Sequence, residues 1–445
     1  MTTSPARAPD ATGPAGASTI RRAIAASAIG NATEWFDYGI YAYGVTYISA
    51  ALFPGDMGDA VLFALATFAI SFLVRPLGGI FWGPLGDRIG RKSVLAFTIL
   101  IMSGATFAVG LIPTYATIGF WAPLLLVVLR MVQGFSTGGE YGGAATFMAE
   151  YAPDNKRGFY GCFLEVGTLA GFSLGAMLML GFSLLLGTDA MHDWGWRIPF
   201  LLAGPMGLVG LYLRAQMEDT PVFRAQEARP DRAMYTPPLG KLVVRYWRPL
   251  IVMGGLVVAL NVANYTLLSY MPTYLERQIG LSVDQSLIVP IVGMLFMMLF
   301  LPALGALSDR IGRKPLWWIS LIGLFALVVP LYMVMATGVW GAMLGFVLLG
   351  LLYAPQLAMI SATFPALFPT SVRFAGFAIA YNVATSLFGG TAPAIGSGLI
   401  MLTGNDLMPA FYMMGACLVG MAALVFMPET AGQPLHFDSF TQEAH

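Results

Sequence analysis

Long apolar stretches recur along the whole chain and are separated by short polar segments. Each has about 20 residues or more, the length an α-helix needs to cross a hydrocarbon core of about 30 Å. Twelve such spans are predicted, at residues 24–52, 60–83, 93–112, 120–148, 159–186, 197–216, 249–275, 285–307, 315–336, 339–364, 374–402 and 409–427. The pattern therefore predicts an all-α integral membrane protein with twelve transmembrane helices.

One long polar stretch falls after the sixth span and divides the chain into two groups of six. We therefore expect a first six-helix bundle at 23–217, a cytoplasmic linker at 218–247 and a second six-helix bundle at 248–428. Residues 1–22 are rich in Ala, Pro, Gly and Thr. They are expected to form a disordered cytoplasmic leader, since the apolar run behind them is too long for a cleaved signal peptide. Residues 429–445 are expected to be a cytoplasmic tail.

A short motif stands once in each half of the chain. GPLGDRIGRK at 83–92 is echoed by GALSDRIGRK at 305–314, and each copy lies between the second and third spans of its half. The repeat predicts two pseudo-symmetric bundles. Parallel six-helix repeats are typical of secondary transporters, whose substrate site lies near the membrane midplane between the halves.

Composition and charge agree with a membrane protein. The chain is 57% hydrophobic and 10% charged, against roughly 45–50% and 25% in soluble domains. Its 23 basic and 23 acidic residues give no net charge, which excludes a basic surface for nucleic acid. Nineteen of the 23 basic residues fall on one side if both termini are cytoplasmic, as the positive-inside rule requires. We expect a multi-pass protein of the inner (cytoplasmic) cell membrane.

The sequence lacks the residues that metal binding, nucleophilic catalysis and ATP hydrolysis require. Cys162 and Cys417 are the two cysteines, and none of the three histidines lies in a span, so no metal ligand set or nucleophile–base pair is expected. No G-x-x-x-x-G-K-[ST] motif occurs, which excludes an ATP-driven pump. We expect no enzymatic activity, no cofactor, no metal and no obligate protein partner. A secondary transporter remains, with an uncoupled facilitator or a channel as the alternative.

Ionisable side chains inside the spans are confined to the first half: Glu34, Asp37, Arg75, Arg130, Glu140 and Glu165. Each costs at least about 2.5–3.5 kcal/mol to insert, so each is a candidate functional residue. Without a histidine in any span, a transported proton must sit on a carboxylate. Two buried acids about one turn apart cannot both be ionised cheaply. Glu34 and Asp37, with Glu140, are therefore the predicted proton-coupling residues.

Polar and aromatic residues near these charges are the predicted substrate contacts. They are Asn31, Trp35, Tyr38, Tyr41, Arg75, Arg130 and Gln133 in the first half, and Asn261, Asn264, Tyr265, Tyr381 and Asn382 in the second. Steps of three and four residues place several of them on one helix face, which we expect to look into a cavity. Structural roles remain alternatives: Arg75 as a gate, Glu140 and Glu165 as bundle-stabilising groups, and the aromatic rings as packing residues rather than a cage for a quaternary ammonium.

The two repeated motifs supply the predicted gating residues: Asp87, Arg88 and Arg91 in the first copy, and Asp309, Arg310 and Arg313 in the second. The acid and the basic residues of each copy can lock neighbouring helix ends together and release them as the halves move. The alternative is that the basic residues only fix the topology.

These motifs resemble the Major Facilitator Superfamily, whose G-x-x-x-D-R-x-G-R-[RK] loop stands here twice. The resemblance extends over residues 20–435. The segments GNATEWFDYGIY (30–41), RMVQGFSTGGEYGG (130–143), EYAPDNKRGF (150–159) and DWGWRIPF (193–200) resemble the metabolite:proton symporter family, and within it most closely the proline/betaine transporters. The resemblance implies proton-coupled uptake of zwitterionic osmolytes, dicarboxylates or shikimate.

The charges in the spans favour a zwitterion among these substrates. Four carboxylates against two arginines suit a dicarboxylate dianion poorly. A zwitterion needs Arg75 or Arg130 for its carboxylate, and Glu34, Asp37 or aromatic rings for its cationic end. We therefore expect a proton symporter that imports proline or glycine betaine by alternating access. The alternative is a proton symporter of a carboxylate metabolite such as 2-oxoglutarate, citrate or shikimate.

Overall fold

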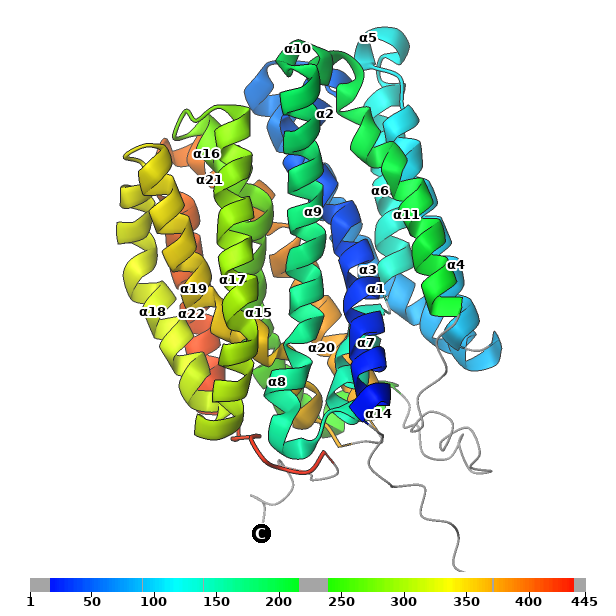
Figure 1. The fold of residues 1–445 in the computed structure, drawn as a ribbon, viewed down its shortest axis with the longest axis vertical. Helices are drawn as coiled ribbons and strands as arrows, with labels where there is room; N and C mark the ends of the chain where they lie inside the picture. The colour runs from blue at the N-terminus through cyan, green and yellow to red at the C-terminus, as the bar shows by residue number, and fades with distance from the viewer. Residues whose placement is uncertain (1–16, 90, 139, 216–238, 370–371, 436–445) are drawn as a thin grey trace, which may run out of the picture.

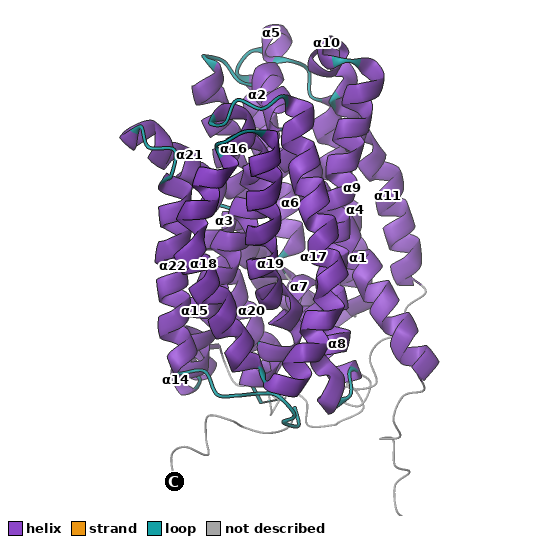
Figure 2. Ribbon diagram, turned by 60° about the vertical axis from the view of Figure 1, so that its left-hand side comes forward, coloured by secondary structure: helices purple, strands orange, loops and turns teal. Residues whose placement is uncertain are grey.

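The computed structural model of the protein describes residues 17–89, 91–138, 140–215, 239–369 and 372–435. Helices are the regular elements of these ranges, which hold no strand. The long helices stand side by side, with short connections at both ends of the bundle (Figures 1 and 2). The predicted all-α fold is confirmed.

The first half contains α1 (Ala17–Tyr43), α2 (Val45–Leu52), α3 (Met57–Ile89), α4 (Arg91–Leu111), α5 (Tyr115–Ile118), α6 (Trp121–Thr137), α7 (Glu140–Tyr151), α8 (Arg157–Gly161), α9 (Phe163–Leu186), α10 (Thr188–Ala190) and α11 (Arg197–Ala215). The second half contains α14 (Leu239–Arg245), α15 (Trp247–Asn264), α16 (Met271–Arg277), α17 (Val283–Ile311), α18 (Arg313–Met335), α19 (Val339–Thr363), α20 (Arg373–Ala384), α21 (Ala392–Thr403) and α22 (Met408–Val425). The halves lie beside each other, with α9 next to α17 at their boundary (Figure 1).

The helices reproduce the predicted spans. Within the described ranges, nine helical stretches are long and apolar enough to cross a membrane. Two shorter apolar helices, Phe97–Leu111 and Arg197–Tyr212, cover the third and sixth spans. Helices α1 and α2 cover the first span; α1 is less apolar because it carries polar and acidic residues. Some spans are interrupted: α6 and α7 together form the fourth.

The outer surface of the bundle is apolar. Leu185, Trp340 and Leu402 are 80%, 82% and 85% exposed, whereas Arg75 and Arg130 are each 1% exposed. Apolar side chains outside and charged side chains inside are the reverse of the distribution in a soluble protein, and they suit a hydrocarbon surrounding. Helices also suit this surrounding, because they satisfy their own backbone hydrogen bonds. The charged side chains of the spans that the structure describes therefore face protein.

Small residues bring α1 and α9 into direct backbone contact. A Cβ atom at Gly171 would lie 2.3 Å from the carbonyl oxygen of Ala32, and one at Gly167 would lie 2.3 Å from that of Ala28. Close packing of small residues is a usual way for helices to associate in membranes, where the hydrophobic effect between them is absent. The two helices are thereby held together along several turns.

Contacts join the halves at both ends of the molecule. We call the end where the described chain begins and finishes the terminal end, and the opposite end the far end (Figure 1). At the far end, Thr46 donates a hydrogen bond to Glu276 (2.7 Å) and Ser183 donates one to Asp284 (2.7 Å). At the terminal end, α8 packs against α17. Both ends of the space between the halves are therefore bridged.

The predicted boundaries fall partly outside the described ranges, which exclude residues 1–16, 216–238 and 436–445. Helix α1 already begins at Ala17, inside the segment predicted as a leader. The last part of the predicted linker forms α14, where the apolar side chain of Leu242 is buried. The division of the chain at 217 and 248 stays a prediction.

Candidate functional site

A small cavity lies between the two halves. Its walls are Trp35 of α1, Tyr141 of α7, Glu165 and Thr168 of α9, Leu260, Asn261 and Asn264 of α15, Tyr353, Leu357 and Ile360 of α19, and Tyr381 of α20. One carboxylate, two amides, the hydroxyl of Thr168 and four aromatic rings, three of them tyrosines, thus share a space walled otherwise by aliphatic groups. Pockets of this kind, mostly apolar with a few converging polar groups, are typical small-molecule sites.

Trp35 is fixed by a hydrogen-bonded neighbour on its own helix. Asn31 accepts a hydrogen bond from the Trp35 indole (3.1 Å). It donates two more, to the carbonyl oxygen of Leu164 (2.9 Å) and to the hydroxyl of Thr168 (2.7 Å). The amide therefore ties α1 to α9 and holds the indole at the cavity. Asn31 was predicted to contact substrate, but in this structure its side chain makes hydrogen bonds to protein groups instead.

Glu165 places a carboxylate in the cavity wall. The side chain is 2% exposed. It accepts a hydrogen bond from the hydroxyl of Tyr141 and another from Thr168. Tyr141 in turn stacks on Tyr381 of the second half, with ring centroids 4.6 Å apart. The acid therefore lies at the boundary between the halves, and its hydrogen bonds come from neutral groups.

The second half contributes amides and hydroxyls near two wide helical turns. Tyr265–Tyr270 after α15 and Thr385–Gly389 after α20 are π-helical turns, which occur often at functional sites. Asn261 donates a hydrogen bond to Thr385 (2.8 Å), so the two interrupted helices are joined where their turns begin. Asn264 accepts one from Tyr353 (3.0 Å). Both predicted asparagines therefore reach the cavity.

Arg75 lies on α3 against Glu34 and Tyr38 of α1 and is not one of the residues that line the cavity. Its Nη2 pairs with Oε1 of Glu34 at 3.3 Å, and its guanidinium lies over the ring of Phe72, 5.3 Å from the centroid. The guanidinium also lies 5.8 Å from the centroid of the Tyr38 ring. In the described chain, its Nε and Nη1 are buried without a hydrogen-bond partner. Both parallel donor pairs of an arginine include Nη2, which Glu34 holds in this structure.

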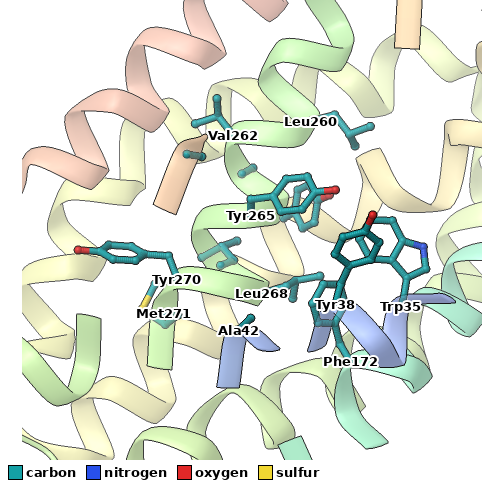
Figure 3. Packing of buried hydrophobic residues seen from close by; sticks show 14 of the residues in the cluster. Trp35, Tyr38, Ala42, Phe172, Leu260, Val262, Tyr265, Leu268, Tyr270 and Met271 are labelled. Atoms are coloured by element: carbon teal, nitrogen blue, oxygen red, sulfur yellow. The ribbon is translucent and has the colours of Figure 1, made fainter. Parts of the chain in front are cut away.

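Aromatic rings fill the space between α1 and the second half. Figure 3 shows Trp35 and Tyr38 of α1 lying beside Phe172 of α9 and facing Tyr265. The ring centroids of Trp35 and Tyr265 are 6.1 Å apart, and the hydroxyl of Tyr38 is 3.0 Å from that of Thr137. Tyr270 lies on the other side of the cluster in the same view (Figure 3). Four of the predicted aromatic residues, Trp35, Tyr38, Tyr265 and Tyr381, thus belong to this region.

A second polar group lies within the first half. Asp37 is hydrogen-bonded to Thr106 and interacts with the charge of Arg130. Arg130 donates a hydrogen bond to Gln133 (2.8 Å), and Gln133 donates one to Thr106 (2.6 Å). We call Asp37, Thr106, Arg130 and Gln133 the α1–α4–α6 network. Its members interact with one another, so the negative charge of Asp37 is balanced by the positive charge of Arg130.

A second small cavity has Asp37 in its wall. It is lined by Gly30, Thr33, Glu34, Asp37, Ile99, Met102 and Ser103. These residues belong to α1 and α4, and none of them belongs to the second half. Two of the three predicted proton-coupling acids, Glu34 and Asp37, therefore share a cavity that is distinct from the one between the halves.

Other predicted site residues lie elsewhere. The hydroxyl of Tyr41 donates to the carbonyl oxygen of Ala64 (2.8 Å), and the ring lies 4.1 Å from the Arg130 guanidinium, so Tyr41 belongs to the interior of the first half. Asn382 donates to the carbonyl oxygen of Gly138 (3.0 Å) across the boundary between the halves. The side chains of Glu140, Asp87, Arg88 and Arg91 lie outside the described part of the structure.

The second copy of the repeated motif bridges the halves at the terminal end. Asp309 accepts hydrogen bonds from the backbone N–H groups of Gly158 (2.8 Å) and Phe159 (2.9 Å) at the start of α8. Arg313, fully buried, pairs with the same carboxylate at 2.7 Å. Arg310 is exposed. The acid of this motif thus holds an element of the other half, while its first arginine contacts none of these groups.

Sequence reasoning missed part of the cavity wall. Tyr141, Thr168 and Tyr353 were not among the predicted contacts, and Glu165 was left without a substrate role. Glu165 carried a usable indication, because an acid inside a span is rare and Thr168 follows it by three residues on the same helix face. Tyr353 carried none, since a single tyrosine in an apolar helix is most often a packing residue.

Within the described ranges, no group of three or more His, Cys, Asp or Glu side chains is placed to hold a metal ion. The charged residues of the spans pair with each other or with neutral hydrogen-bonding groups, as described for Arg75 and Asp37. Two halves of membrane-spanning helices that enclose a small polar cavity define a secondary transporter.

Comparison with known proteins gives the family. The Major Facilitator Superfamily profile matches residues 35–383. The chain therefore belongs to the Major Facilitator Superfamily, and it is a transporter rather than an enzyme. The glycine betaine/proline/ectoine/pipecolic acid transporter OusA of Dickeya dadantii is 44% identical over 425 residues, which cover 94% of this chain and 85% of that protein. The proline/betaine transporter of Escherichia coli (strain K12) is 42% identical with the same coverage.

A further relative and a solved structure extend this picture. The ectoine/proline transporter ProP of Corynebacterium glutamicum is 43% identical over 432 residues, covering 94% of this chain and 85% of that protein. The structure of the proton:xylose symporter XylE bound to 6-bromo-6-deoxy-D-glucose has a TM-score of 0.74 at 18% identity, covering 95% of this chain and 98% of that one. At that identity the likeness shows the fold, and the predicted arrangement of twelve helices in two halves is confirmed.

Proposed function

We propose that this transporter imports a small zwitterionic osmolyte such as proline or glycine betaine together with a proton. The observation that carries the proposal is the buried guanidinium of Arg75, whose Nε and Nη1 have no hydrogen-bond partner within the described residues and whose Nη2 is held by Glu34. A substrate carboxylate that takes the place of Glu34 at Nη2 gains a pair of parallel N–H donors, the usual way in which an arginine binds a carboxylate. The relatives named for proline, betaine and ectoine transport support this substrate class.

The proton site in this proposal is the α1–α4–α6 network. Asp37 carries the proton, and Glu34 connects it to substrate because Glu34 pairs with Arg75. When a substrate carboxylate binds Arg75, it competes with Glu34 for the guanidinium, and the freed carboxylate raises the local negative charge beside Asp37. The added charge favours proton binding. Glu140 stays a predicted participant.

Alternating access is the proposed mechanism, with the terminal end facing the cytoplasm. This orientation rests on the excess of Lys and Arg in the segments at that end. Asp309 then forms part of the cytoplasmic gate, since it binds α8 of the other half through two backbone N–H groups. Opening this end requires these bonds to part. Asp87, Arg88 and Arg91 are proposed to act in the same way in the first copy.

Transport by the purified protein in proteoliposomes tests the proposal. An inward proton gradient should drive accumulation of labelled glycine betaine and proline, and a protonophore should abolish it. Replacing Na⁺ by K⁺ should leave the rate unchanged. Inhibition by 2-oxoglutarate, citrate or shikimate but not by betaine would instead establish a carboxylate transporter, and flux that ignores the gradient would establish an uncoupled facilitator.

A further inference from the structure

We propose that Glu165 and the aromatic rings around it form the subsite that receives the cationic end of the transported zwitterion. This inference rests on the proposed function and makes it more specific. The subsite consists of the Glu165 carboxylate with the rings of Trp35, Tyr141, Tyr353 and Tyr381, which share one cavity between the halves. We call these five residues the onium subsite.

The other buried acids of the first half already have cationic neighbours. Glu34 pairs with Arg75 at 3.3 Å, and Asp37 interacts with Arg130. Glu165 differs from both, because the groups that interact with it in the described chain are the neutral side chains of Tyr141 and Thr168. A buried carboxylate without a counter-charge is costly, and a bound cation offsets that cost. Of these three acids, Glu165 is therefore the one at which a positively charged ligand gains the most binding free energy.

The aromatic rings determine which kind of cation fits. A quaternary ammonium group has no N–H to donate, so it is stabilised by ring faces and by diffuse negative charge rather than by hydrogen bonds. Tryptophan gives the strongest such contact, and Trp35 is held at the cavity by its bond to Asn31. A secondary ammonium can also donate its N–H groups to Glu165. The subsite therefore accepts both methylated and cyclic ammonium compounds.

The position of Arg75 completes the recognition of a zwitterion. Arg75 pairs with Glu34, the residue that precedes Trp35 on α1, so the positive group is paired with the chain neighbour of one ring of the subsite. A short zwitterion can place its carboxylate at Arg75 and its cationic end at Glu165. Residues of both halves then contact one ligand, which is the arrangement that alternating access requires.

Binding to the purified full chain in nanodiscs, measured by calorimetry, tests the subsite. The probes are glycine betaine and 3,3-dimethylbutyrate, its isostere with carbon in place of the charged nitrogen. Wild type should bind betaine at least about tenfold more tightly than the isostere. In Glu165→Gln this preference should fall several-fold, because affinity for betaine drops while affinity for the isostere is kept. Asp189→Asn, an exposed acid, is the control and should keep the preference.

A second pair of variants keeps the test valid if Glu165→Gln fails to fold. Trp35→Phe retains a ring face and should keep most of the preference for betaine, whereas Trp35→Leu should lose several-fold of it. An unchanged preference in a folded Glu165→Gln protein would overturn the subsite. The subsite would also be overturned if Glu165→Gln bound and exchanged betaine normally but lost proton-driven accumulation. Glu165 would then be a proton site. If wild type binds neither betaine nor proline, the proposed function itself fails.

Discussion

The two halves of the transporter share a fold but differ in what they bury. Inside its spans the first half carries four acids and two arginines, and the second half carries none. The second half instead presents Asn261, Asn264, Tyr353 and Tyr381 to the cavity. Pseudo-symmetry of the backbone therefore does not extend to the chemistry. The comparison suggests that charge movement is confined to one half, while the other half fits the shape and hydrogen-bonding groups of the ligand.

The strongest test of this division is Asp37→Asn. Removing the titratable group from the α1–α4–α6 network should abolish proton-driven accumulation in proteoliposomes, because the amide cannot take up a proton. Exchange of internal for external betaine should persist, since it needs no net proton movement. Asp189→Asn, an exposed acid, should behave as wild type. Accumulation that survives in Asp37→Asn would show that the proton is carried elsewhere.

Arg75→Lys should have the next largest effect. Lysine keeps the charge but cannot offer two parallel N–H donors to a carboxylate. We expect the KM for betaine and proline to rise by about ten- to a hundredfold, from the loss of a charge-assisted hydrogen bond. Uptake kinetics measure the change, with the exposed Arg248→Lys as control. An unaltered KM would remove Arg75 from the substrate site.

In the second half, Asn264→Ala should have a smaller effect of a different kind. It removes the acceptor of the Tyr353 hydroxyl, a loss of about 1 kcal/mol, or about fivefold in KM. The pH dependence of uptake should stay that of wild type, because no titrating group is touched. Exposed Asn405→Ala serves as control. A shifted pH profile would show that the second half takes part in proton coupling.

An effect of similar size is expected at the gate at the terminal end. Asp309→Asn weakens the bonds to Gly158 and Phe159 and the pair with Arg313, so the terminal end should open more often. Cys162, buried and hydrogen-bonded to Phe159, reports this opening through its rate of maleimide labelling. We expect a rise of about fivefold, as for one lost hydrogen bond. A Cys162→Ser background corrects for labelling of Cys417, and an unchanged rate would separate Asp309 from gating.

Hydrophobic length and repetition were sufficient to predict the helices, because crossing a bilayer imposes a strict length on each span. The partners of the buried charges were harder to predict. The chain is buried without a break from Glu34 to Ser49, through the end of α1 and into α2. The polar stripe of α1 therefore did not reveal which neighbour each residue meets: Trp35 reached the cavity between the halves, whereas Tyr41 met the backbone of α3. Such distinctions depend on helix rotation, which spacing alone does not fix.

The close contact of α1 with α9 has a mechanical consequence. No side chain separates the two backbones at Gly167 and Gly171, so little compressible material lies between them. Glu165 is carried by α9, and Asp37 is carried by α1. A ligand that displaces α9 by a fraction of an ångström therefore moves α1 with it. Through these glycines, ligand binding beside Glu165 in one cavity shifts the position of Asp37 in the other.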